Sequence, residues 1–367
     1  MRVFQVGNIY ASHLDRMKPT LDNLVGYEET HAAILGDVAH AQLLSPAADE
    51  AGSITLCFPQ YLRGLRQWAR EKGLSEKTEE DDILLAQVEE HRTEVFYSIN
   101  ATRHSAAFLK RMPGTVRLLI GWLGSPIVGD TFPHYHAVVS NFPSINARHA
   151  EMGLSTHYLT PSYETQTDRI PDRPWTGRMT DLFFAGTYSR HHQRRAQLLE
   201  LVADEASERT LNADLRLLPS RFTALAERTP LGLFPPFSHV RRPRSVRHFS
   251  KLPVFGREMF GLFADSKIVM NMAIDMAGSD RGNMRCFEAM SAGSLMISDE
   301  GTYPDGFEPG ETHLVYRDVS EAISIARSCL NDPEKASSIA AKGATLMRYR
   351  YSKARQWADF QSLCAGL

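Results

Sequence analysis

The sequence predicts an α/β protein with two doubly wound, Rossmann-like domains, each a parallel sheet covered by helices on both faces. Short apolar runs alternate with amphipathic stretches along most of the 367 residues, and this alternation is typical of βαβ units. The length exceeds one ordinary domain and suits two. Polar or glycine-containing loops follow several of the apolar runs, and such folds bind ligands at the carboxyl ends of their parallel strands.

The first half of the chain carries the expected first sheet. Apolar runs predict strands at 3–6, 54–58, 94–98, 116–120, 137–140 and 156–159, and amphipathic stretches predict helices at 61–70, 79–92 and 144–152. The strand at 94–98 leads into the polar loop 100–104. Its last residue is His104, whose unperturbed pKa lies near neutrality and suits proton transfer. A histidine that only begins a helix is the alternative.

Residues 161–178 are expected to form a linker, because three prolines separated by polar residues interrupt the periodic pattern. They divide the chain into a first domain, 1–160, and a second domain, 179–347, followed by a terminal helix, 348–367. Apolar runs in the second domain predict strands at 182–185, within 211–218, and at 268–272, 295–297 and 314–316. The strongly basic segment 240–251 is expected to be a surface loop that attracts anions.

The run 279–299 is the most informative part of the sequence. It predicts a glycine-containing loop, a short helix that ends at Gly293, and a buried strand at 295–297. A helix N-terminus offers free N–H groups and a partial positive charge, so the loop before it suits a phosphate or diphosphate. Gly282 lets the backbone approach such a ligand closely. The loop contains one carboxylate, Asp280, and the helix contains another, Glu288.

A series of motifs follows in order along the second domain: Ser-Lys-Ile-Val-Met-Asn-Met at 266–272, Arg-Cys-Phe-Glu-Ala-Met-Ser-Ala-Gly at 285–293, Phe-Glu-Pro-Gly-Glu at 307–311, Tyr-Arg-Asp at 316–318, Asn-Asp-Pro-Glu at 331–334 and Tyr-Ser-Lys-Ala-Arg at 351–355. With these motifs, residues 255–351 resemble the C-terminal domain of group 1 glycosyltransferases, especially the branch of spore-coat glycosyltransferase-like proteins. Weaker similarity reaches back to residues 181–186.

The resemblance implies the glycosyltransferase-B (GT-B) architecture, two domains facing across a cleft. The second domain would bind a nucleotide-sugar donor and the first an acceptor, with the terminal helix packed back toward the first domain. The resemblance places Glu288 at the nucleotide ribose and Asp280 near the transferred sugar. At the position of Asp280, the family usually has Glu. The expected catalytic residues are Asp280 and His104, and the expected donor-binding residues are Gly186, Arg190, Asn271, Gly282, Asn283, Met284, Arg285 and Glu288.

Each of these residues also has a purely structural interpretation. Glu288 is alternatively a helix-surface carboxylate paired with Arg285, and Asp280 an N-cap or turn residue. Arg190 is alternatively part of a solvated helix face, and Asn271 an amide that stabilises a turn.

Composition sets limits on partners and compartment. The net charge of −2 requires no nucleic acid, and no segment reaches the ~18 apolar residues of a membrane span, so at most peripheral membrane contact is expected. The four cysteines are scattered as in a reduced, cytoplasmic protein. No metal-ligand spacing or Asp-x-Asp motif is present, so we expect neither a metal site nor a cofactor.

The sequence therefore predicts a glycosyltransferase that moves a sugar from a nucleotide-sugar to a glycan, lipid-linked or protein acceptor, with retention of configuration and without a metal. A nucleotide-sugar epimerase of the same fold and a non-catalytic assembly or binding protein are the alternatives.

Overall fold

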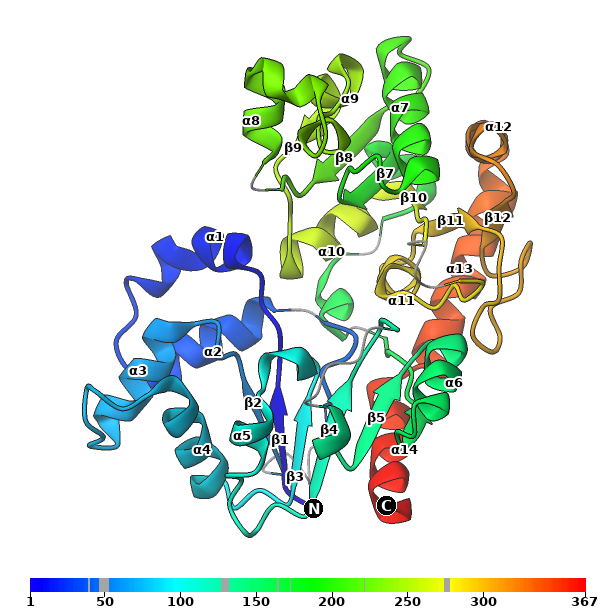
Figure 1. Ribbon diagram of the computed structural model, residues 1–367. Coiled ribbons are helices and arrows are strands. Elements are labelled where there is room, and N and C mark those ends of the chain that lie inside the picture. The colour runs from blue at the N-terminus through cyan, green and yellow to red at the C-terminus, as the bar shows by residue number, and fades with distance from the viewer. Residues whose placement is uncertain are drawn as a thin grey trace. The chain divides into compact units, whose positions relative to one another are not determined.

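The computed structural model describes residues 1–38, 40–45, 53–126, 132–163, 165–171, 173–220, 222–273 and 278–367. These form two compact units, one made of Met1–Glu164 with Tyr351–Leu367 and the other of Thr165–Arg350. Each unit contains a six-stranded sheet in which every pairing is parallel (Figure 1). The predicted fold class, two doubly wound α/β domains, is confirmed.

Unit 1 has the strand order β2-β1-β3-β4-β5-β6. Its strands are β1 (Val3–Val6), β2 (Ile54–Cys57), β3 (Val95–Ser98), β4 (Leu118–Trp122), β5 (Ala137–Ser140) and β6 (Thr156–Tyr158). Its helices are α1 (Ala11–Leu21), α2 (Tyr27–Asp37), α3 (Leu62–Glu71), α4 (Glu80–Glu90), α5 (Ala106–Leu109), α6 (Pro143–Glu151) and α14 (Lys353–Gly366).

The sheet of unit 1 is buried on both faces, which explains why its strands read as continuous apolar runs. Val3 lies on one face in a core cluster that includes residues of α1, α2 and α14. Phe4 lies on the other face in a cluster that includes residues of α4 and α5. The terminal helix α14 belongs to the first cluster, where the ring centroid of Phe360 lies 5.0 Å from that of Tyr97.

Unit 2 has the strand order β12-β11-β10-β7-β8-β9. Its strands are β7 (Thr180–Gly186), β8 (Ala213–Leu217), β9 (Ser250–Lys251), β10 (Ser266–Met270), β11 (Leu295–Asp299) and β12 (Leu314–Tyr316). Its helices are α7 (Gln193–Ser207), α8 (Thr223–Arg228), α9 (Arg244–Phe249), α10 (Gly256–Ala264), α11 (Met284–Ser291), α12 (Val319–Asn331) and α13 (Pro333–Arg350).

The centre of unit 2 follows the predicted loop, helix and strand of residues 279–299. α11 ends next to Gly293, whose φ of +73° is the left-handed conformation that glycine adopts without strain. Residues of β11 are buried on both faces. On one face they join a core cluster that includes residues of α7 and α12, while α11 and α13 pack nearby. The helix N-terminus is thereby fixed beside the carboxyl edge of the sheet.

Two segments differ from the expected loops. Residues 240–251, expected to be a surface loop, instead contain α9 and β9, because Val246 is fully buried and holds the helix on the core. Part of the expected linker, 161–178, is folded onto unit 2. There Trp175 enters the core cluster, and the buried Arg178 donates a hydrogen bond to the Ser266 carbonyl over 3.0 Å. The division between the units falls at Glu164 and Thr165.

Candidate functional site

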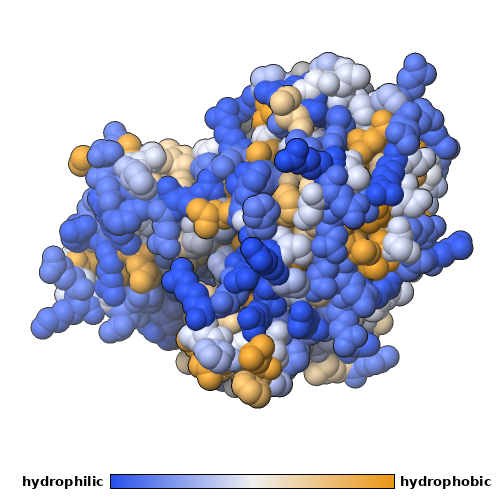
Figure 2. All heavy atoms as spheres, turned by 90° about the horizontal axis from the view of Figure 1, so that it is seen from above, coloured by the Kyte–Doolittle hydropathy of each residue, from blue (hydrophilic) through white to orange (hydrophobic). Residues whose placement is uncertain are grey.

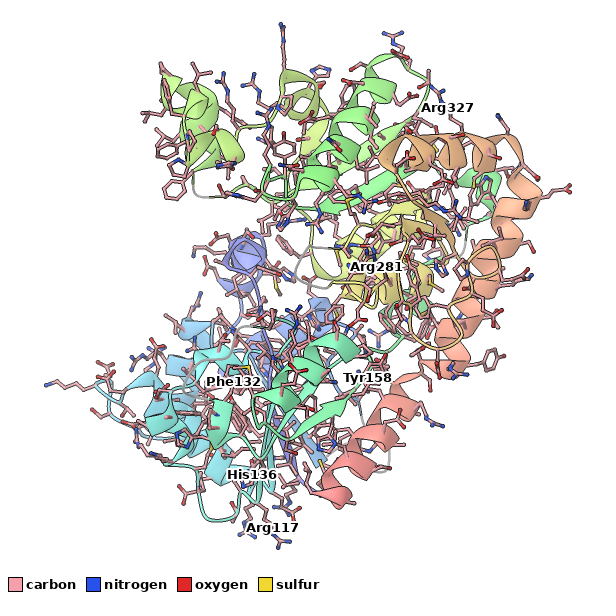
Figure 3. The ribbon with its side chains drawn as sticks, turned by 45° about the vertical axis from the view of Figure 1, so that its right-hand side comes forward. Arg117, Phe132, His136, Tyr158, Arg281 and Arg327 are labelled. Carbon is pink, nitrogen blue, oxygen red and sulfur yellow. The ribbon has the colours of Figure 1, made fainter. Side chains whose placement is uncertain are left out.

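The candidate site lies at the carboxyl edge of the second sheet, where the loop before α11 meets the ends of β10 and β11. Asn271 directly follows β10, and Asp299 is the last residue of β11. Asn271 is hydrogen-bonded to Asn283 of the loop, and Asp299 is ion-paired with Arg281 of the same loop. Figure 3 labels Arg281 in the segment that precedes α11. The fold thus brings the predicted loop to the edge where α/β sheets bind ligands.

A reciprocal amide pair joins the loop to the sheet. Nδ2 of Asn271 donates to Oδ1 of Asn283 over 3.0 Å, and Nδ2 of Asn283 donates to Oδ1 of Asn271 over 2.9 Å. Nδ2 of Asn271 also lies 2.9 Å from the Ser298 hydroxyl, and the Tyr316 hydroxyl donates to the Asn271 carbonyl. Asn271 is buried, and these bonds tie the end of β10 to the loop before α11.

Within the described residues, the start of α11 has no side-chain cap. Asn283 is the N-cap residue, yet its side chain accepts no backbone N–H of the first turn. Its Oδ1 accepts instead from Nδ2 of Asn271 and from the Cys286 thiol. The first N–H groups of an α-helix have no partner within the helix. Asn283, Met284 and Arg285 are half-exposed. The helix therefore presents uncapped N–H groups and its positive dipole end to an anion.

An ion pair that the sequence analysis missed fixes the same loop. Nε of Arg281 lies 2.7 Å from Oδ2 of Asp299, and both side chains are at most 10% exposed. Oδ1 of Asp299 accepts the backbone N–H of Ala273 over 2.9 Å. Asp299 had a usable sequence signal, because a carboxylate at the carboxyl end of an apolar strand faces the ligand edge of a parallel sheet.

Asp280 is buried, and it forms a parallel bridge with Thr302. Backbone hydrogen bonds of 2.8 Å on either side, from Arg281 to Thr302 and from Thr302 to Ser279, hold this bridge. Gly301 makes the close approach possible, because a Cβ there would lie 2.5 Å from the Ser279 carbonyl oxygen. The N-cap of α11 is Asn283, so the alternative of Asp280 as N-cap is wrong.

Glu288 is paired with Arg285, but not on the surface. Their charged atoms lie 2.8 Å apart, and the Glu288 side chain is only 8% exposed. The Arg285 guanidinium also donates to the Ala185 carbonyl at the end of β7 and lies over the Phe263 ring, 4.8 Å from its centroid. The alternative interpretation of Glu288 was a helix-surface carboxylate paired with Arg285. The pairing agrees with that interpretation, but the burial of Glu288 does not. Arg285 thereby connects Glu288 to the strand end that carries Gly186.

The loop after β7 holds the other two predicted donor residues. Gly186 is the last residue of β7 and is partly exposed. Arg190 is exposed, and its Nε donates to the Tyr188 hydroxyl, which donates to Glu200 over 2.7 Å. The hydrogen bond to Tyr188 raises the pKa of Arg190. Within the described residues, no hydrogen bond or ion pair joins Arg190 to the loop before α11.

His104 occupies the interior of unit 1 rather than an accessible edge. It is 3% exposed, its Nε2 lies 3.0 Å from the Ser98 hydroxyl, and its ring stacks on Phe108 with centroids 4.9 Å apart. Burial lowers its pKa to about 3. A proton shuttle needs solvent access and a pKa near neutrality. This environment corrects the predicted role and makes His104 a neutral core residue.

A cluster of neutral side chains lies at the carboxyl edge of the first sheet. Oδ1 of Asn8 accepts hydrogen bonds from Gln60 over 3.0 Å and from Asn100 over 3.3 Å. These residues follow β1, β2 and β3, which are neighbours in the sheet, and all three are half-exposed. Sequence analysis singled out only the loop containing Asn100. Amide groups in this arrangement suit the hydroxyls of a neutral ligand.

Two features are absent from the described part of the chain. That part holds no group of three or more His, Cys, Asp or Glu side chains able to bind a metal ion. None of the helices described there combines the length and apolar character needed to span a bilayer. Its cysteines, Cys57, Cys286, Cys329 and Cys364, are all free thiols.

Part of the sequence matches a known protein family. Residues 234–362 match the family model described as glycosyl transferase-like, and this region includes the loop before α11 and the whole of that helix. This part of the chain is similar to that family. The predicted resemblance to glycosyltransferases is confirmed over this region. No curated protein sequence matches the chain.

Solved structures extend the likeness to the whole chain at the level of the fold. HepE from Anabaena, in complex with UDP-glucose, has 11% identity and a TM-score of 0.57 over 100% of both chains. Sucrose-phosphate synthase from Thermosynechococcus elongatus has 11% identity and a TM-score of 0.53 over 100% of this chain and 99% of that one. TarM from S. aureus has 9% identity and a TM-score of 0.53 over 78% and 59%. The chain therefore has the fold of these structures, the GT-B fold.

Proposed function

We propose that this chain transfers a sugar from a nucleoside-diphosphate sugar to an acceptor hydroxyl, with the donor bound at the carboxyl edge of the second sheet. The observation that carries the proposal is the uncapped N-terminus of α11, fixed beside β10 and β11 by the amide pair of Asn271 and Asn283. An anion as compact and highly charged as a diphosphate fits that helix end. HepE, which shares the fold, was solved with UDP-glucose and with UDP.

In this proposal the two carboxylates take different parts of the donor. Glu288 accepts hydrogen bonds from the ribose hydroxyls while Arg285 orients it. Asp280 lies near the transferred sugar. Gly186 and Gly282 allow backbone to approach the diphosphate, and the N–H groups at the start of α11, at Met284 and Arg285, bind it.

The reaction breaks the bond between the anomeric carbon and the diphosphate oxygen, which leaves with the electron pair. Donors aimed at the oxygen that gains charge stabilise such a transition state. The acceptor oxygen attacks the anomeric carbon from the same face, so configuration is retained, and its proton passes to the departing phosphate oxygen. This route uses no protein nucleophile and no metal. The acceptor, whether glycan, lipid-linked or protein, would bind at the amide cluster of Asn8, Gln60 and Asn100 through a neutral hydroxyl.

The test is a panel of nucleotides and nucleotide-sugars, read first by thermal shift. A ligand at ~100-fold excess over its Kd stabilises the fold by ~2.7 kcal/mol. The ligands that stabilise the protein are then incubated with an acceptor extract, and the products are identified by mass spectrometry.

The outcomes separate the three candidate functions. Release of free nucleotide that depends on the acceptor supports the transferase. Conversion of the nucleotide-sugar to its epimer without nucleotide release supports the epimerase. Stabilisation by no nucleotide favours the non-catalytic assembly or binding protein and overturns the proposal.

A further inference from the structure

The segment between β8 and β9 differs in charge from the rest of the chain. Residues 219–252 contain seven Arg or Lys residues and a single acidic residue, Glu227, in a chain whose net charge is −2. Here α8, η6 (Pro230–Leu233) and η7 (Phe237–His239) pack on one another, and α9 follows. We call residues 219–252, where the structure describes them, the basic lobe. Positive charge is therefore concentrated in one part of unit 2.

Large apolar side chains of the basic lobe are exposed to solvent. Leu233 is 65% exposed, Phe234 64% and Leu252 78%, and Leu231 is 47% exposed. Figure 2 views the molecule from the side on which α8 and α9 lie in Figure 1, and apolar and hydrophilic atoms alternate across that face. A gathering of exposed large apolar side chains marks an interaction surface rather than an ordinary solvated one.

One described arginine of the basic lobe is ion-paired, and the other described ones are not. Arg241 lies against η6, since its Cδ is 2.9 Å from the position of a Cβ on Gly232. Arg242 is ion-paired with Glu227 over 2.6 Å. Within the described residues, the basic lobe has no second carboxylate, and its other arginines form no ion pair: Arg228, Arg241, Arg244 and Arg247.

Part of the lobe also forms an open groove of about 520 Å³, which is lined by Ser207, Arg244, Ser245, Arg247 and His248. Its two guanidinium groups are the donors that bind phosphate oxygens most strongly. The groove thus offers a place for a phosphate-bearing group on the basic lobe.

We infer that the basic lobe docks on a lipid bilayer that contains anionic headgroups. Leu231, Leu233 and Phe234 enter the boundary between headgroups and acyl chains, while Arg244 and Arg247 bind headgroup phosphates. An anionic membrane surface binds both apolar side chains and arginines. Each arginine near anionic lipid strengthens binding about fivefold. A nucleic acid would bind the arginines but leave the exposed leucines in water.

The test is co-sedimentation of the full chain with vesicles of phosphatidylcholine alone or with 30% phosphatidylglycerol, at low and high salt. We expect binding only to the anionic vesicles, and less of it at high salt, because salt screens the arginines. Arg244→Glu/Arg247→Glu and Leu233→Ser/Phe234→Ser should each weaken binding at least tenfold. The matched controls carry equal changes elsewhere: Lys110→Glu/Arg148→Glu at exposed cations of unit 1, and Met179→Ser/Tyr349→Ser at exposed apolar residues of unit 2.

Three results would overturn the inference. The wild-type chain fails to sediment with anionic vesicles, or the control variants lose as much binding as the lobe variants. The third result is that Leu233→Ser/Phe234→Ser binds vesicles as well as wild type does, while Arg244→Glu/Arg247→Glu does not. That result would assign the basic lobe to a soluble polyanion. Circular dichroism of each variant establishes that it is folded.

Discussion

The carboxyl edges of the two sheets are built from different chemistry. At the edge of unit 2, ion pairs join Arg281 to Asp299 and Arg285 to Glu288, and all four side chains are at most 17% exposed. At the edge of unit 1, the side chains that meet are the neutral amides of Asn8, Gln60 and Asn100. Buried charge pairs require exact geometry to offset their desolvation, whereas neutral amides do not.

The difference indicates how each unit would treat its ligand. A rigid, charged edge suits a ligand that is constant and anionic, such as the diphosphate of a donor. An edge of half-exposed amides suits neutral hydroxyls, whose arrangement differs from one acceptor to another. The two units share one fold, so the contrast comes from the residues at the strand ends and not from the architecture.

The largest effect should come from breaking the ion pair that fixes the edge of unit 2. Asp299→Ala leaves the Arg281 guanidinium buried and unpaired and removes the acceptor for the Ala273 N–H. We expect a loss of about 3–5 kcal/mol in the free energy of unfolding, measured by urea denaturation. Lys72→Ala, which breaks an exposed ion pair with Glu90 in unit 1, is the control and should change stability by less than ~1 kcal/mol. Similar losses in both variants would show that the edge of unit 2 is not held by its charges.

The second prediction concerns donor binding. Glu288→Ala should weaken binding of the nucleotide-sugar by ~1.5–3 kcal/mol, the usual contribution of a hydrogen bond to a charged group. Isothermal titration calorimetry with the donor found in the screen measures it, and Glu208→Ala, at an exposed carboxylate of the same unit, should bind as wild type does. Unchanged affinity in a folded Glu288→Ala protein would remove this residue from the donor site.

The third prediction uses pH to test the neutral interior of unit 1. The pKa of His104 is lowered to about 3 by burial, below an unfolded value near 6.5. The unfolded chain therefore binds one more proton than the folded chain between these two values, and stability falls as the pH drops below 6.5. The loss from this one group at pH 5 is ~2 kcal/mol relative to pH 8.

A substitution isolates this contribution. Across urea titrations from pH 8 to pH 5, His104→Gln should reduce the pH dependence by that amount. The half-exposed His157→Gln should leave it unchanged. If the free energy of unfolding of His104→Gln depends on pH as strongly as that of the wild type, His104 is not held neutral in the folded protein.

The fold was readable from the sequence because its strands are buried on both faces. Continuous apolar runs such as 295–297 have no other stable position in an α/β protein, and Gly293 marks the end of the preceding helix. The segment 240–251 was misjudged, because its many arginines concealed the one fully buried side chain, Val246, that makes it a helix.

The site was harder to predict than the fold, because pairing between distant residues leaves no local pattern. The sequence marked Glu288 and Arg285 as neighbours on one helix, yet their burial depends on Phe263 and on the end of β7. Arg281 and Asp299 are eighteen positions apart, and they meet because the loop before α11 forms a backbone bridge with Thr302, just after β11. His104 was judged by its ordinary pKa, which tertiary burial overrides.

The smallest predicted effect tests the contrast between the two edges most directly. Asn283→Asp replaces an amide with a carboxylate at the N-cap of α11, and the new side chain still accepts the hydrogen bond from Asn271. A negative charge there competes with the donor diphosphate for the helix end, so the Kd of the donor should rise about fivefold, equivalent to ~1 kcal/mol. Asn100→Asp makes the same change at the edge of unit 1 and should leave the donor Kd unaltered, because the diphosphate does not bind there. Calorimetry measures the donor Kd of both variants. If the Kd rises equally in both, or rises only in Asn100→Asp, our proposal has placed the diphosphate at the wrong edge. The distinction between a charged donor edge and a neutral acceptor edge would then fail.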